Sequence, residues 1–168
     1  MKTSAVGRRL IKSFEGYRQD AYLCPAGIPT IGYGHTSGVE LGDTCTREEA
    51  EEFLRRDIAE AEKAINAQNL SLGQYQFDAL VSLVYNIGVD AFLDSTLLKL
   101  LSNDTVPRDE LEKWWKAWKY ADGVVLKGLV RRRAAEWSLY KNGFFLLTLP
   151  VLLLVAVLIV LLLIRKNK

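Results

Sequence analysis

The C-terminal part of the chain holds an apolar segment of a kind that compact water-soluble domains seldom contain. Residues 144–164 read FFLLTLPVLLLVAVLIVLLLI, which is 21 positions without a charged side chain. A helix of this length spans roughly 31 Å, which matches the hydrocarbon core of a bilayer. A helix buried in a protein core is the alternative, but such helices rarely stay apolar on every face. The sequence therefore predicts a transmembrane helix over residues 144–164, followed by a short basic tail over residues 165–168.

The part of the chain before this segment has a nearly balanced charge. Three basic residues lie in the tail, which leaves 19 Lys and Arg against 20 Asp and Glu before residue 144. The net charge of +2 for the whole chain is therefore no indication of a nucleic-acid partner. The one basic run of this part, Arg131 to Arg133, is best explained as a solvated or locally ion-paired helix face.

Residues 1–143 are expected to form one α+β domain, with a small β lobe near the N-terminus and helices elsewhere. Glycine and proline residues divide short β-prone runs between residues 22 and 45, which predicts a small twisted sheet. Thr46 and Glu49 match a capping box, the pattern that opens a long helix. Apolar residues at helical spacing predict further helices over residues 3–14, 73–87, 95–102, 107–119 and 126–141.

Glu15 is the first candidate functional residue. It ends the N-terminal helix and precedes the glycine-rich region, so we expect it at a cleft between two parts of the domain. A carboxylic acid that is partly desolvated in a cleft has a raised pKa and can donate its proton to a leaving oxygen. Taken alone, however, Glu15 fits a surface residue at a helix end better. Likewise, Thr30 alone fits an ordinary strand residue, and His35 a buried or ion-paired structural histidine.

The spacing of these residues carries more information than each residue does. Glu15, Cys24 and Thr30 follow the pattern Glu-x8-Cys-x5-Thr, and Thr30 opens the segment TIGYGH. This pattern resembles the signature Glu-x8-Asp/Cys-x5-Thr of the phage-type lysozymes, the muramidase endolysins of glycoside hydrolase family 24. The downstream segments QYQFDALVSLVYNIG and GLVRRRAAEWSLY are also similar to segments of this family. The resemblance covers nearly all of residues 3–143.

This resemblance implies a lysozyme-like fold and hydrolysis of peptidoglycan at the β-1,4 bond between N-acetylmuramic acid and N-acetylglucosamine, in phage lysis of a host cell. It implies that Glu15 protonates the glycosidic oxygen and that Thr30 helps to position the hydrolytic water. Cys24 would assist that water or stabilise positive charge on the sugar, in a reaction that the family is described as running with inversion. The resemblance implies neither a cofactor nor a metal, and the catalytic domain is expected to be monomeric.

Cys24 stands where glycoside hydrolysis ordinarily uses a second carboxylate. A thiol with a pKa of about 8.5 is mostly neutral at pH 7, so it is a poorer base than aspartate. Three hypotheses remain: Cys24 replaces the aspartate, Glu15 acts alone in a lytic transglycosylase, or the protein is a membrane-tethered, non-catalytic peptidoglycan-binding module. The nearest carboxylate, Asp20, lies outside the motif and fits a turn or surface residue.

The two cysteines, Cys24 and Cys45, are too few for a disulfide framework and match no metal-binding spacing. Both flank the expected β lobe. A redox-controlled disulfide between them is one hypothesis, and two separate reduced thiols are the other.

The position of the apolar segment departs from the family pattern, in which lysozymes are soluble or carry an N-terminal export segment. The RKNK tail favours a cytoplasmic C-terminus, which would place the catalytic domain on the periplasmic face of the host inner membrane. A domain held in the cytoplasm until the membrane is damaged is the rival arrangement. With one alanine and no glycine, residues 144–164 are expected to stay inserted in the bilayer. A segment that oligomerises and perturbs the membrane is disfavoured, because it lacks a face of small residues.

Overall fold

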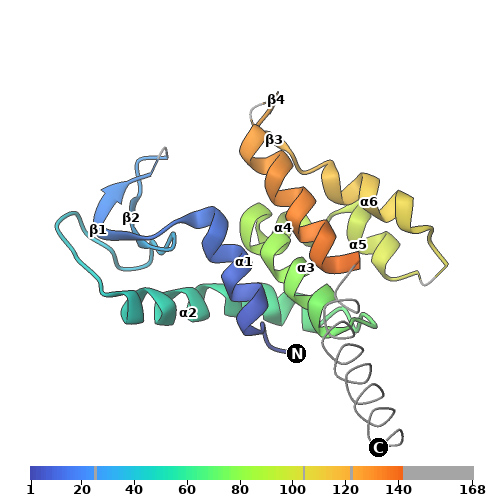
Figure 1. The fold of residues 1–168 in the computed structure, drawn as a ribbon, viewed down its shortest axis with the longest axis horizontal. Coiled ribbons are helices and arrows are strands. Elements are labelled where there is room, and N and C mark those ends of the chain that lie inside the picture. The colour runs from blue at the N-terminus through green and yellow to red at the C-terminus, as the bar shows by residue number, and fades with distance from the viewer. Residues whose placement is uncertain (25, 104, 122, 142–168) are drawn as a thin grey trace, which may run out of the picture.

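The computed structural model describes residues 1–141, apart from residues 25, 104 and 122. A small β lobe lies beside a larger group of helices, and the long helix α2 extends from one to the other (Figure 1). The elements are α1 (Ala5–Glu15), β1 (Arg18–Leu23), β2 (Pro29–Gly32), α2 (Arg47–Asn66), α3 (Gln74–Ile87), α4 (Val89–Leu93), α5 (Thr96–Leu101), α6 (Arg108–Lys116), β3 (Tyr120–Ala121) and β4 (Val124–Val125). Residues 127–141 are also helical and are called helix 127–141 below.

Both ends of α1 are defined by their capping residues. The Ser4 side chain accepts hydrogen bonds from the first-turn amides, and the Ser4 backbone N–H donates to Asp78 on α3 at 2.9 Å. At the other end, Gly16 has a φ of 72°, a left-handed conformation that ends the helix directly after Glu15. Gly7 lets α1 approach α3 closely, because a Cβ there would lie 2.9 Å from the Cβ of Asp78. The α1 termini therefore fix the position of Glu15.

The β lobe is a two-stranded antiparallel sheet, as the glycine-rich region predicts. Strands β1 and β2 pair with Tyr22 opposite Thr30, and the sheet begins four residues before the predicted region. Gly32, with a φ of 65°, brings the end of β2 against α2: a Cβ there would lie 3.0 Å from the Cβ of Ala50. This contact seats the β lobe on the N-terminal half of α2.

Helix α2 begins with the predicted capping box. The Glu49 amide donates to the Thr46 hydroxyl at 3.2 Å, and the Thr46 amide donates to the Glu49 carboxylate at 2.8 Å. The apolar face of the helix is buried along its whole length, at Ala50, Leu54, Ile58, Ala61 and Ile65. A buried stripe of this kind lets one helix support both parts of the domain.

The core of the helical part is built around α3, in which residues 77–84 are all buried. Helix 127–141 packs against α6 through aromatic rings: Trp115 lies 5.8 Å from Trp137 and 5.1 Å from Tyr140, between ring centroids. The predicted helices are confirmed, with boundaries moved by up to three residues. The short helix α4 and the β3–β4 hairpin were not predicted.

The predicted membrane segment is not part of the described structure. Among the described residues, no helix is both long enough and apolar enough to cross a bilayer. Residues 144–164, the tail 165–168 and the domain boundary at residue 143 all lie outside the described residues. These three assignments stay predictions.

Candidate active site

Glu15 lies at the C-terminal end of α1 and faces helix 127–141. Its side chain is 23% exposed, and its Oε1 accepts a hydrogen bond from Nη1 of Arg132 at 2.6 Å. Because the Arg132 side chain is 5% exposed, this ion pair is largely shielded from water on one side. The pair joins residues that are 117 positions apart in the sequence.

A buried cluster holds Arg132 in place. Its Nε donates to Oε1 of Glu136 at 3.1 Å, and its Nη2 donates to the Ser82 carbonyl at 3.3 Å. Glu136 is fully buried and also accepts from the Ser82 hydroxyl at 2.8 Å and from Nε1 of Trp115 at 3.2 Å. With these contacts satisfied, the Arg132 guanidinium has little freedom, so the Glu15 carboxylate has a defined orientation.

The basic run is only in part what the sequence predicts. Arg132 and Arg133 are ion-paired locally, with Glu136 at i+4 and i+3, as predicted. They are 4% and 1% exposed, so the ion-paired alternative applies to both and the solvated alternative to neither; of the three arginines, only Arg131 is exposed. Nε of Arg133 lies 2.8 Å from Oε2 of Glu136 but is not aligned for a hydrogen bond.

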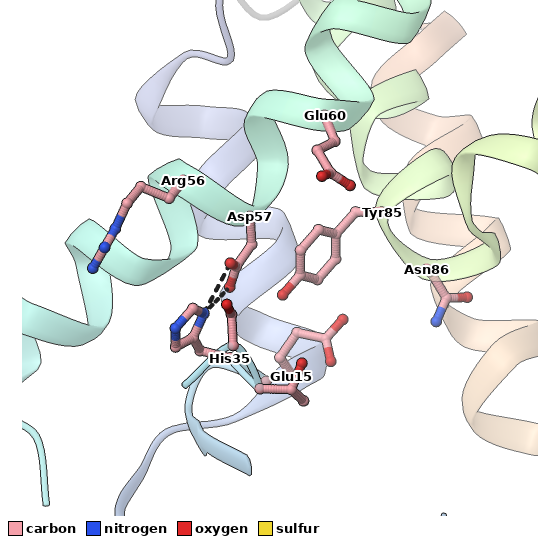
Figure 2. A pocket seen from close by; sticks show the side chains of 10 residues that line it. Glu15, His35, Arg56, Asp57, Glu60, Tyr85 and Asn86 are labelled. Atoms are coloured by element: carbon pink, nitrogen blue, oxygen red, sulfur yellow. Dashed lines mark hydrogen bonds and ion pairs between the residues drawn. The ribbon is translucent and has the colours of Figure 1, made fainter. Parts of the chain in front are cut away.

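A glycine turn and a tyrosine close the other side of Glu15. Gly34 has a φ of 101°, and a Cβ there would lie 3.8 Å from Oε2 of Glu15 and 3.5 Å from the Tyr85 hydroxyl. The Tyr85 hydroxyl donates to the Tyr33 carbonyl at 3.1 Å. Burial, together with the nearby charges of Glu15 and Asp57, raises the pKa of Tyr85, so this phenol stays a donor at neutral pH. Figure 2 shows Tyr85 and Glu15 on facing elements.

His35 has the structural role that its sequence context predicts. Its Nδ1 lies 2.9 Å and 3.0 Å from the two carboxylate oxygens of Asp57 on α2, as the dashed lines in Figure 2 show. Its ring stacks on Phe53, with 4.6 Å between centroids, and the residue is 8% exposed. His35 therefore ties the end of the glycine-rich segment to α2.

Two hollows meet at Glu15. The first, of about 650 Å³, lies between the β lobe, α2 and α3, and it is lined by Glu15, Gly34, His35, Thr36, Ser37, Arg56, Asp57, Glu60, Tyr85 and Asn86 (Figure 2). The second, of about 1240 Å³, lies toward helix 127–141, and it is lined by Ser13, Phe14, Glu15, Asn86, Leu126, Lys127, Gly128, Leu129, Arg131 and Arg132. Glu15 and Asn86 line both hollows. The predicted cleft position of Glu15 is thus confirmed.

Cys24 and Thr30 lie together at the tip of the β1–β2 hairpin. The Thr30 hydroxyl donates to the Ile28 carbonyl at 2.9 Å, and so does the Cys24 amide at 3.0 Å. Hydrogen bonds from the backbone amides of Ile28 and Ala26, with a smaller one from Thr30, lower the pKa of the Cys24 thiol. Neither Cys24 nor Thr30 is among the described residues that line the two hollows at Glu15. The structure therefore brings two of the three motif residues into contact.

Comparison with known proteins identifies the family. The family model described as phage lysozyme matches residues 12–136. The chain belongs to the phage lysozyme family. The predicted resemblance is thereby confirmed, and with it the prediction that the protein is a muramidase enzyme.

Individual relatives agree with this assignment. The lysozyme is 46% identical over 146 residues to an endolysin of Acyrthosiphon pisum secondary endosymbiont phage 1, covering 85% of this chain and 100% of that one. It is 40% identical to an endolysin of Bacillus phage PZA, with 85% of this chain covered, but it spans only 56% of that protein. The solved muramidase domain of SpmX from Asticaccaulis excentricus is 41% identical, with a TM-score of 0.77, covering 83% of this chain and 97% of that one. The predicted lysozyme-like fold is therefore confirmed.

A second group of relatives carries the name SAR-endolysin. A protein of Haemophilus phage HP1 named SAR-endolysin is 33% identical over 141 residues, which cover 77% of this lysozyme and 76% of that protein. An endolysin of Enterobacteria phage P21 with the same name is 33% identical over 126 residues, covering 73% of this chain and 74% of that one.

The other residues that the sequence analysis of this lysozyme considered are either buried or exposed to solvent. Cys45 is a free thiol that is 4% exposed, and burial raises its pKa. Cys24 is also free and is partly exposed, so the two thiols are separate in this structure. Asp20 is exposed on β1, as predicted.

The sequence analysis did not predict that Arg132 and Tyr85 lie next to Glu15. Arg132 belongs to the basic run and Tyr85 to the segment QYQFDALVSLVYNIG, but neither pattern indicates a contact with Glu15.

Proposed function

We propose that this lysozyme hydrolyses peptidoglycan at the β-1,4 bond between N-acetylmuramic acid and N-acetylglucosamine, with Glu15 as the general acid. The observation that supports this most strongly is the position of Glu15, which is a carboxyl group held by Arg132 at the junction of two hollows. A glycan strand that runs through both hollows would pass the carboxyl group at a bond between two sugars. A carboxylic acid at that point can protonate the leaving oxygen.

The proposed reaction is a single displacement. The carboxyl proton of Glu15 passes to the glycosidic oxygen while the bond from this oxygen to C1 of the muramic sugar breaks. A water molecule attacks C1 from the opposite face and loses a proton, which leaves a reducing muramic end with inverted configuration. The hydrogen bond from Arg132 reaches Oε1, so Oε2 is the oxygen that we assign to the substrate.

We assign the water to Cys24 and Thr30. The amide donors around Cys24 lower the pKa of its thiol, so the thiolate is more abundant at neutral pH than in an ordinary cysteine. A thiolate there can accept a proton from the water or stabilise positive charge on the sugar, while the adjacent Thr30 hydroxyl helps to orient the water. Under this assignment Cys24→Asp keeps most of the activity and Cys24→Ser reduces it. Full activity of Cys24→Ser would rule out a direct role for the thiol.

The membrane location is part of the proposal. Residues 144–164 would anchor the enzyme in the host inner membrane, with residues 1–143 as the catalytic domain on the periplasmic side, where peptidoglycan lies. The relatives named SAR-endolysin support a link to the membrane. Protease protection of the catalytic domain in spheroplasts tests the orientation: a domain that is degraded from outside agrees with the proposal, and a fully protected domain contradicts it.

Mass spectrometry of the products tests the chemistry. Purified sacculi are digested with the wild type, with Glu15→Gln and with Glu52→Gln, a control at a side chain that is 56% exposed on α2. We expect reducing N-acetylmuramic ends from the wild type and the control, and none from Glu15→Gln. Products with 1,6-anhydromuramic ends would instead indicate a transglycosylase, in which a hydroxyl of the substrate replaces water. Binding to sacculi without any cleavage by the wild type would indicate a non-catalytic binding protein.

A further inference from the structure

The two hollows at Glu15 differ in their charge. The hollow next to the β lobe contains two further carboxylates, Asp57 and Glu60, beside one arginine. The hollow next to helix 127–141 contains three cations, Lys127, Arg131 and Arg132, and its only described acid is Glu15, which Arg132 pairs. A substrate that occupies both hollows therefore meets a strongly cationic wall on one side only.

Two of these cations are available to a ligand. Lys127 and Arg131 are exposed, and neither forms an ion pair with a described residue. They are four residues apart on helix 127–141, so their side chains lie on the same face of the helix, one turn apart. Like charges at this spacing repel each other and weaken a helix, and an anion between them removes that repulsion. Arg132, by contrast, is already held by Glu15 and Glu136.

The chemistry of peptidoglycan identifies the anion. The amino sugars of the glycan strand are N-acetylated and carry no charge once the lactyl group of muramic acid is joined to its peptide. The carboxylates of the polymer therefore belong to the peptide stems. Apolar side chains of the same hollow, Phe14, Leu126 and Leu129, suit the aliphatic part of such a stem.

We propose that Lys127 and Arg131 bind a free carboxylate of the peptide stem, and that they make the enzyme prefer peptidoglycan whose stem carboxylates are free over peptidoglycan in which they are amidated. An arginine guanidinium can bind both oxygens of a carboxylate, and the lysine adds a second charge. Amidation removes the negative charge and replaces one acceptor oxygen by an NH2 group. This group is a donor, so it cannot accept a hydrogen bond from either cation. This inference rests on the proposed function, since it concerns the substrate of that same cleft.

The test compares two forms of one substrate. Purified sacculi are used as prepared or after conversion of their carboxylates to amides with a carbodiimide and ammonium ions. We measure kcat/KM on both forms for the wild type, for Lys127→Gln/Arg131→Gln and for the charge-conserving Lys127→Arg/Arg131→Lys. The matched control, Arg9→Gln/Lys99→Gln, removes two exposed cations from α1 and α5 that do not line this hollow.

We expect the wild type to prefer untreated sacculi by about three- to thirty-fold, the range for two exposed charge contacts. The preference should shrink at high ionic strength, disappear in the glutamine double variant, and remain in the charge-conserving variant and in the control. An unchanged preference in the glutamine variant, an equal loss in the control, or a wild type that cleaves both forms equally well would overturn the inference while leaving the proposed function intact. A wild type that cleaves neither form would overturn the proposed function itself.

Discussion

The buried cluster beneath Glu15 predicts how the domain responds to the loss of one charge. Glu136 is fully buried and contacts Arg132 at 3.1 Å and Arg133 at 2.9 Å. Burial raises the pKa of Glu136, but two guanidinium groups and two neutral donors face its carboxylate, so we assign it the ionised state at pH 7. Glu136→Gln keeps the size of the side chain and leaves two buried arginines with one fewer counter-charge.

The magnitude follows from the burial of the arginines. Removing one partner of a buried ion pair costs about 3–5 kcal/mol, because the remaining charge stays desolvated. We expect the lower end of that range, about 3 kcal/mol, because Glu15 still pairs with Arg132 and an amide oxygen in the position of Oε1 still accepts from the Ser82 hydroxyl. The amide nitrogen then takes the position of Oε2, so the hydrogen bond from Trp115 is lost. For a protein of this size, that loss corresponds to a decrease in Tm of roughly 6–12 °C.

Chemical denaturation followed by circular dichroism measures this loss directly. The matched control is Glu52→Gln, because Glu52 also pairs with an arginine three residues away, but with both side chains 56% exposed. The control should cost less than about 1 kcal/mol, as exposed ion pairs do. Glu136→Gln should also lower turnover at temperatures at which it is folded, since Arg132 orients Glu15. A loss of stability no larger than that of the control would refute the reasoning that the cluster is held by buried charge.

Three further predictions concern single residues. Because the pKa of Cys24 is lowered, iodoacetamide should alkylate it with a pH midpoint below that of free cysteine. Cys45 is buried and should react only after unfolding, so equal alkylation rates for the two thiols would contradict this prediction. Gly34→Ala should cost about 1–2 kcal/mol in denaturation experiments, because a φ of 101° disfavours a Cβ; an unchanged stability would argue against this turn. Burial raises the pKa of Glu62, but hydrogen bonds from Lys2 and the Thr3 amide outweigh this, so the pKa is lowered overall. The ionised Glu62 therefore stabilises the folded protein above pH ~4.5, and this stabilisation is lost as the pH falls through the folded-state pKa. The Tm difference between wild type and Glu62→Gln should therefore shrink below pH ~4.5, and a constant difference would contradict the assignment.

Elements with a clear local pattern were predictable from the sequence. The capping box at Thr46 and the apolar stripe after it determine where α2 begins and which face it buries. Gly16 ends α1 at the predicted residue. By contrast, α4 has five residues and strands β3 and β4 have two each, which is too short for a periodicity to develop.

The positions of the candidate residues on helices and strands were predictable, but their contacts were not. The sequence predicts Glu15 at the end of a helix and a small sheet over the region that contains Cys24 and Thr30, and the structure agrees with both. No local pattern reveals that Arg132 reaches Glu15, because the contact depends on how α1 and helix 127–141 pack. The same holds for Tyr85, because its hydroxyl and the Glu15 carboxylate come from different helices and both lie next to Gly34. Long-range packing decided these contacts.

The rate of sacculus solubilisation by Glu15→Gln tests the central claim most directly. The substitution keeps the size and the hydrogen-bond acceptor that faces Arg132 but removes the proton that an acid must donate. We expect a loss of at least about 100-fold in turnover relative to the wild type and to Glu52→Gln, since positioned acid catalysis contributes about 10²–10⁴-fold. Circular dichroism should show that the variant is folded. A folded Glu15→Gln protein that solubilises sacculi at the wild-type rate would contradict the assignment of Glu15 as the catalytic acid.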